Sequence, residues 1–146
     1  MANEQTVVAP LSKLWWVILL AISAATIANV LFYYVVTRLL GEPLMMPEQD
    51  LPPAAVPLPV EEVVLFSVIF SVGACTVFVL LARLVKRPIK VYVVVSLVVL
   101  TLLNFLPFRA PDPPVTMATK LTLVMMHVIG AIAVVGMLVW LGRRRR

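Results

Sequence analysis

The chain has 146 residues, of which 62% are hydrophobic and only 13% are charged, and its mean hydropathy is +1.07. Soluble domains are about 45–50% apolar and about 25% charged, and a globule of this size could not bury so much apolar surface. The composition therefore excludes a soluble domain and a disordered chain, and it indicates an integral membrane protein. The net charge of +5 comes from bases beside apolar segments, so it is attributed to membrane topology and not to nucleic-acid binding.

Four uncharged apolar segments are long enough to cross a bilayer, whose core of about 30 Å needs about 20 helical residues. They are residues 14–37, 63–82, 91–108 and 121–142. Lipid offers no partner to backbone N–H and C=O groups, and the alternation of a barrel strand is absent, so each segment is expected to be a helix. The predicted fold is an all-α membrane protein, an antiparallel four-helix transmembrane bundle with a proline-rich outer loop between helices one and two. The bundle domain spans residues 14–142, between a cytoplasmic tail of residues 1–13 and an arginine tail of residues 143–146.

The first apolar segment has the alternative of being a cleaved signal peptide. Its basic region is the single lysine Lys13, and the apolar run continues through Tyr33 and Tyr34, past any plausible cleavage site. An uncleaved signal anchor is therefore expected.

Basic residues concentrate on one side of the predicted membrane. Nine lie with the two ends of the chain and the loop between segments two and three, against three on the other side. The positive-inside rule then predicts a plasma (inner) membrane protein with both termini in the cytoplasm. Eight of the nine are topology and lipid-headgroup candidates: Arg83, Lys86, Arg87, Lys90, Arg143, Arg144, Arg145 and Arg146.

Prolines dominate the loop between segments one and two, where six of the twelve lie between Pro43 and Pro59. The stretch from Leu51 to Pro59 is expected to be extended, in polyproline II geometry, and to lie across the mouth of the bundle. It is interpreted as a connector, a lid or a partner-binding strap. Elsewhere, Pro88 is expected to begin helix three and Pro107 to end it, and Thr116 or Thr119 to cap helix four.

Small residues at helical spacing predict where the helices approach closely. These seams are Ala21-xxx-Ala25 and Ala24-xxx-Ala28 in helix one, Ser67, Ser71 and Cys75 in helix two, and Gly130, Ala133 and Gly136 in helix four. Helix three is bulkier and is expected to have the most lipid contact.

Polar residues inside the apolar segments are the best functional candidates, because each costs free energy unless it is partnered. Asn29, Asn104 and His127 all fall in the outer half of the membrane, and Ser67 and Ser71 lie at similar depth. The sequence permits one polar cluster below the outer mouth, where His127 could bind a ligand or a proton. The alternative is a neutral histidine that joins two helices by a hydrogen bond.

No cofactor or metal is expected. A haem would lack a second histidine, and Cys75 with His127 cannot complete a zinc site. The chain also lacks GxSxG, P-loop and HExxH motifs and has no acidic pair at depth, so it is not expected to be an enzyme.

The chain resembles a bacterial family of small four-helix integral membrane proteins of unknown function. The resemblance rests on Asn29, the outer proline loop, the segments Leu65-Phe-Ser and Leu81-Ala-Arg-Leu of helix two, and Met126-His127-Val128 before the small residues of helix four. It implies a polytopic membrane protein and supplies no catalytic residue.

Two functions follow as hypotheses. The first is a structural or accessory component of a larger membrane assembly, with lipids and other subunits or a second copy as partners and no nucleic acid. The second is a small-molecule binder or transporter that uses an outer-leaflet polar cavity around Asn29, Asn104 and His127. As a transporter it is expected to oligomerise, because four helices are few for a transporter protomer.

Overall fold

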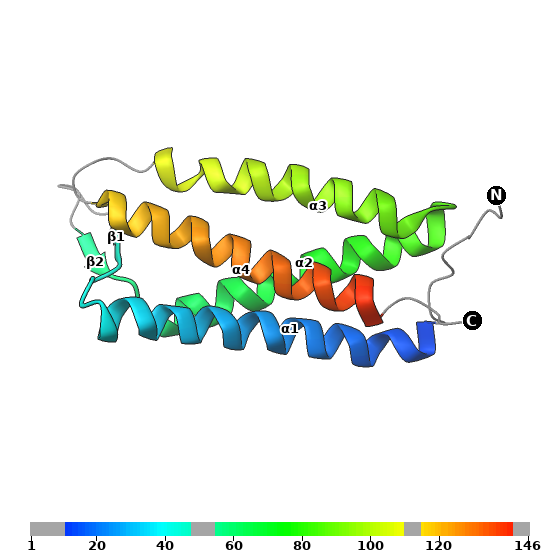
Figure 1. Cartoon of the computed structure of the whole chain (residues 1–146), viewed down its shortest axis with the longest axis horizontal. Helices are drawn as coiled ribbons and strands as arrows, with labels where there is room; N and C mark the ends of the chain where they lie inside the picture. Colours follow the sequence, from blue (N-terminus) through cyan, green and yellow to red (C-terminus); the bar gives the residue numbers. More distant parts are fainter. Residues whose placement is uncertain (1–10, 48–54, 110–114, 142–146) are drawn as a thin grey trace.

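A computed structural model describes residues 11–47, 55–109 and 115–141. Four long helices form a bundle: α1 (Leu11–Tyr34), α2 (Val60–Leu84), α3 (Pro88–Phe105) and α4 (Met117–Leu141). Successive helices run in opposite directions (Figure 1), and each is long and apolar enough to cross a membrane. The predicted all-α bundle of four candidate membrane spans is therefore confirmed.

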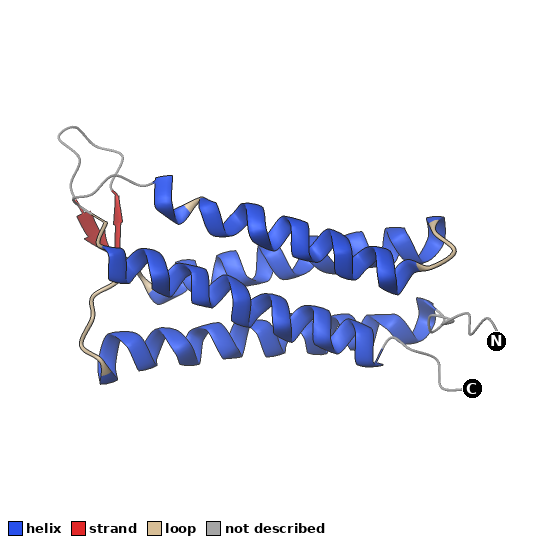
Figure 2. Ribbon diagram, turned by 45° about the horizontal axis from the view of Figure 1, so that its top comes forward, coloured by secondary structure: helices blue, strands red, loops and turns tan. Residues whose placement is uncertain are grey.

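Short elements extend two of the helices and fill one connection. A π-helix, η1 (Val35–Leu39), continues α1, and a 3-10 turn, η2 (Pro107–Arg109), follows α3. Two strands, β1 (Met45–Pro47) and β2 (Ala55–Pro57), pair in an antiparallel hairpin between α1 and α2. The hairpin lies at the end of the bundle where α1 finishes and α4 starts (Figure 1 and Figure 2), which we call the hairpin end. The opposite end, where α2 joins α3, is the α2–α3 end.

Helix boundaries follow the turn residues that the sequence supplies. Pro88 occupies the first turn of α3, and the helix ends at Phe105, two residues before Pro107. The hydroxyl of Thr116 accepts a hydrogen bond of 3.2 Å from the backbone N–H of Thr119, so Thr116 caps α4. These three predictions are confirmed. Both α2 and α4 begin before their apolar segments, and α2 takes two carboxylates into its first turn, where the helix dipole favours negative charge.

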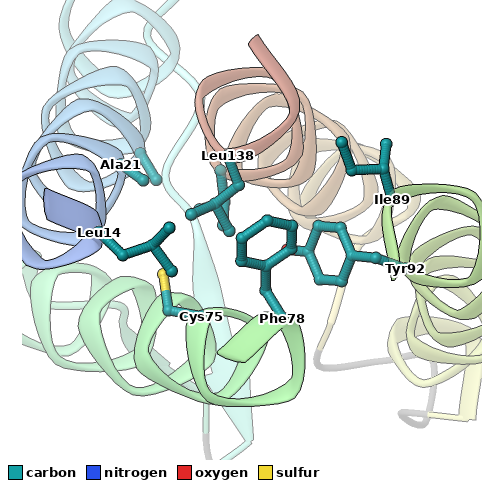
Figure 3. Packing of buried hydrophobic residues seen from close by; sticks show 9 residues of the cluster. Leu14, Ala21, Cys75, Phe78, Ile89, Tyr92 and Leu138 are labelled. Carbon is teal, nitrogen blue, oxygen red and sulfur yellow. The ribbon is translucent and has the colours of Figure 1, made fainter. Parts of the chain in front are cut away.

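The α2–α3 end is held by an apolar core to which all four helices contribute. Phe78 of α2 and Tyr92 of α3 pack edge to face, with ring centroids 5.0 Å apart and planes at 73°. Leu14 of α1 and Leu138 of α4 close around them (Figure 3). Aromatic pairs of this geometry add to the stabilisation from buried area, so this contact fixes α3 to the other helices.

Beyond this core, α3 is the least buried helix. Its buried residues, Pro88, Ile89 and Tyr92, all lie in its first five positions, and 11% of its apolar 18-residue window is buried against 28% for the window of α2. The expectation that helix three has the most lipid-facing surface agrees with this.

A second apolar cluster closes the hairpin end. Leu44 and Leu58, on either side of the hairpin, are buried against Val36, Val63 and Met126. The described part of the proline-rich loop therefore packs against the hairpin end of the bundle. Its described part is extended as predicted, but residues 55–57 form a strand where polyproline II geometry was expected, because residues 45–47 supply a hydrogen-bonding partner. Residues 48–54 lie outside the described part.

The small-residue seam of α2 is confirmed, and those of α1 and α4 are confirmed only in part, since Ala24 and Ala28 of α1 are only partly buried. Ala21 and Ala25 are buried on α1, and Ser67, Ser71 and Cys75 are all buried on one face of α2. On α4, Gly130 meets α1, but Gly136 is exposed. Six residues rotate a side chain by about 120° around a helix, so two steps of three cannot keep both glycines on one face.

Candidate functional site

Among the polar candidates, Asn29 of α1 makes a buried side-chain hydrogen bond to a neighbouring helix. It is only 8% exposed, and its Nδ2 donates a hydrogen bond of 2.9 Å to the Oγ of Ser67 on α2. On its other side it lies against Gly130 of α4, where an added Cβ would come within 3.2 Å of the same Nδ2. Asn29 therefore joins three helices at one level, with a hydrogen bond to α2 and a close contact with α4.

The oxygen of the Asn29 amide differs from its nitrogen in its hydrogen bonding. Asn29 Oδ1 is buried and has no hydrogen-bond partner among the described residues. Ser71 lies one turn along α2 from Ser67 and is buried on the same face. The pair of serines and the amide thus make a narrow polar layer between the two apolar cores.

His127 of α4 lies beside an aromatic ring of α2. Its imidazole and the Phe70 ring meet edge to face, with centroids 6.3 Å apart and planes at 75°. Its Nδ1 is buried and has no hydrogen-bond partner within the described ranges. The histidine is therefore not an interhelical hydrogen-bonded link through this nitrogen.

Asn104 is in the last turn of α3, where that helix is poorly covered. Its Oδ1 is also buried without a hydrogen-bond partner in the part of the chain that the structure describes. The structure thus brings Asn29 and Ser67 into direct contact. No described hydrogen bond joins His127 or Asn104 to that pair, so a single shared cavity remains a prediction.

Four of the eight basic candidates lie in the described part of the chain. Arg83, Lys86, Arg87 and Lys90 are exposed around the α2–α3 connection, where headgroups would lie if the helices cross a membrane. Arg143, Arg144, Arg145 and Arg146 lie outside the described residues. Within the described ranges no three His, Cys, Asp or Glu side chains come together as a metal site.

Two features of the hairpin end were not anticipated from the sequence. Lys120, taken as a flanking charge, is only 5% exposed in the first turn of α4. A cleft of about 460 Å³ lies between η1 and the return segment of the loop, and among the described residues Arg38 is the one base that lines it. A partial signal for the cleft was present in the clustering of Tyr33, Tyr34 and Arg38 at the end of the first apolar segment.

Comparison with known proteins places the chain by family alone. A model for a family of unknown function (DUF6069) matches residues 9–145. No curated protein and no solved structure matches.

Proposed function

Because the chain belongs to DUF6069, a family of unknown function, we propose its role from its structure: a structural or accessory component of a larger membrane assembly. The proposal assigns it no catalysis. The observation that carries it is the exposed hairpin-end half of α3, which buries none of its own residues after Tyr92, although Pro107 of the following turn is buried.

The hairpin-end half of α3 is open to an additional helix. Leu97, Val98, Leu102 and Phe105 are all exposed, and the core contacts of this helix stop at Tyr92. Helices in lipid associate through close packing and interhelical hydrogen bonds and gain no hydrophobic driving force. A helix of another subunit beside α3 would supply the packing that this bundle does not.

Buried polar atoms near this side support the same conclusion. Asn104 Oδ1 and His127 Nδ1 have no hydrogen-bond partner among the described residues. Hydrocarbon cannot hydrogen-bond to them, and an unpartnered polar group there costs free energy. A change of rotamer that turns these buried atoms outward would let a polar side chain on a partner helix remove this cost.

We propose further that the assembly lies in a plasma (inner) membrane with both chain termini on the cytoplasmic side. The four described bases around the α2–α3 connection support this orientation through the positive-inside rule. They would also lie near anionic headgroups, where each base contributes about 1 kcal/mol.

Native mass spectrometry of the protein extracted gently from its own membranes tests the accessory role. The expected result is a defined stoichiometric complex with other subunits or with further copies of this chain. Leu102→Trp, which enlarges the exposed face of α3, should abolish that complex.

Ile27→Trp is the matched control, because Ile27 is similarly exposed but lies on α1. It should leave the complex intact. A wild-type protein recovered only as a bare monomer would contradict the proposal, as would equal loss of the complex in both variants.

The second candidate is a small-molecule binder or transporter, and the unpartnered His127 Nδ1 favours it. In the same experiment it predicts an extra small mass on the wild-type protein that disappears in His127→Ala. An unchanged extra mass in that variant would exclude the site at His127.

A further inference from the structure

The cleft at the hairpin end has the size of a small-ligand site. Its volume is about 460 Å³, within the range of about 300–1,000 Å³ that is usual for such sites. One wall is the end of α1 and η1, with Tyr33, Tyr34, Thr37 and Arg38, and the other is the loop that returns to α2. The return wall consists of Pro57, Leu58 and Val60, and Gly41, Pro43 and Leu44 lie between the two walls.

The backbone at the end of α1 shapes this cleft. The helix widens to π geometry over Val35–Leu39, and the N–H of Leu40 donates to Val35 O at 3.1 Å. Gly41 then reverses the chain with φ of +69°, a conformation that other residues rarely adopt. Single π turns occur frequently at functional sites, because the extra residue redirects the side chains.

Two of the polar side chains are occupied in building the walls. The hydroxyl of Tyr33 donates to Leu58 O at 2.9 Å and ties the end of α1 to the return segment. Thr37 Oγ1 donates to Tyr33 O at 2.8 Å, within the helix. These two hydrogen bonds stabilise the walls of the cleft, and neither involves the Arg38 guanidinium.

The other two polar groups are available to a ligand. Within the described part of the chain, neither the Arg38 guanidinium nor the Tyr34 hydroxyl makes a hydrogen bond or an ion pair. Guanidinium binds phosphate through two parallel charge-assisted hydrogen bonds, and a phenol adds a further donor.

The depth of the cleft in the membrane indicates which kind of phosphate group it would bind. Arg38 follows an uncharged stretch of 24 residues from residue 14. That stretch is about 36 Å long as a helix, slightly more than the hydrocarbon core, so Arg38 falls at headgroup level. The neighbouring acids Glu42 and Glu61 adjoin the lining residues Gly41 and Val60, and both are exposed. A ligand here therefore meets a cation in the cleft lining, and two exposed acids lie one residue along the chain from lining residues.

We propose that this cleft binds the headgroup of a zwitterionic aminophospholipid of the phosphatidylethanolamine class. Arg38 and Tyr34 hold the phosphate, Glu42 and Glu61 face the ammonium group, and the acyl chains follow the apolar surface of α1. The negative charges of Glu42 and Glu61 disfavour a purely anionic headgroup.

Native mass spectrometry of the full chain, with competing lipids of identical acyl chains, tests the proposal. Phosphatidylethanolamine should be retained in preference to phosphatidylglycerol and phosphatidylcholine. Arg38→Gln should lower its retention about tenfold, the effect of one charge-assisted phosphate contact. Tyr34→Phe should lower it a few-fold with an unchanged unfolding midpoint, and Glu42→Gln should remove the preference over phosphatidylglycerol.

Arg109→Gln is the matched control, because Arg109 is also exposed near the hairpin end but does not line the cleft. It should bind as the wild type does. Equal retention in Arg38→Gln and the wild type would overturn the proposal, and so would a wild-type preference for phosphatidylglycerol. Displacement of the lipid by soluble phosphoethanolamine at millimolar concentration would overturn the lipid assignment in favour of a free phosphate ester.

Discussion

At the scale of single residues, the contact between Asn29 and Gly130 determines how closely α1 and α4 can approach. The Asn29 amide fills the space above Gly130 while its Nδ2 is held by Ser67. We expect Gly130→Ala to destabilise the bundle, because the new Cβ would sit 3.2 Å from Nδ2 and the amide can withdraw only by straining its hydrogen bond. The loss should be about 1 kcal/mol in the free energy of unfolding, measured by titration with denaturing detergent.

Gly136→Ala on the same helix is the control. Nothing lies within 4 Å of its added Cβ, so the better helix propensity of alanine should leave stability unchanged or raise it by up to about 1 kcal/mol. In an Asn29→Ala background, Gly130→Ala should also become harmless. A Gly130→Ala protein as stable as the Gly136→Ala protein would mean that the contact is not a constraint.

The sequence could predict that Asn29, Ser67 and His127 lie at similar depth, because depth depends only on the distance along each helix. It could not predict which of them touch. That depends on how each helix is rotated and on which neighbour it faces, and both are set by packing. Asn29 pairs with Ser67 and not with His127 because the buried face of α2 carries Ser67 and Ser71 toward α1. The partners of the other two polar residues could not be read from spacing alone.

At the scale of the helices, the buried residues of α3 itself are confined to its start. Phe78 is fully buried against Tyr92, and α3 buries no residue beyond Tyr92. We expect Phe78→Ala to lower the free energy of unfolding by about 3 kcal/mol or more, since it removes a buried ring and leaves a cavity. Phe66→Ala, on the exposed face of the same helix, should change it by less than about 1 kcal/mol in the same titration. Equal losses in the two variants would show that α3 is held elsewhere.

The hairpin shows what an element prediction from sequence omits. Prolines correctly excluded a helix between α1 and α2, since they remove backbone donors and fix φ. They did not reveal that the two extended segments, residues 45–47 and 55–57, would pair as strands. That pairing depends on the sharp turn at Gly41 and on the burial of Leu44 and Leu58. The π turn was equally hidden, since it changes only the hydrogen-bond partner of a few residues in an apolar run.

At the scale of the whole molecule, the two ends of the bundle differ in charge and in structure. The α2–α3 end carries exposed bases around an apolar core, whereas the hairpin end carries the cleft and the exposed acids Glu42 and Glu61. The four spans could be predicted from sequence because hydropathy over about 20 residues is a local property. Orientation depends on the insertion process, which responds to the bases, and so it needs a direct measurement.

We expect cysteine labelling to place the α2–α3 end in the cytoplasm. Lys86→Cys lies at that end and leaves eight of the nine bases in place, and Pro43→Cys lies at the hairpin end; both positions are exposed. A membrane-impermeant maleimide added to intact cells should label Pro43→Cys at once and Lys86→Cys only after permeabilisation. The native Cys75 is 3% exposed within α2, so the wild-type protein should remain unlabelled and serves as the control. Labelling of Lys86→Cys in intact cells, with Pro43→Cys protected, would invert the orientation and place the proposed headgroup cleft in the cytoplasmic leaflet.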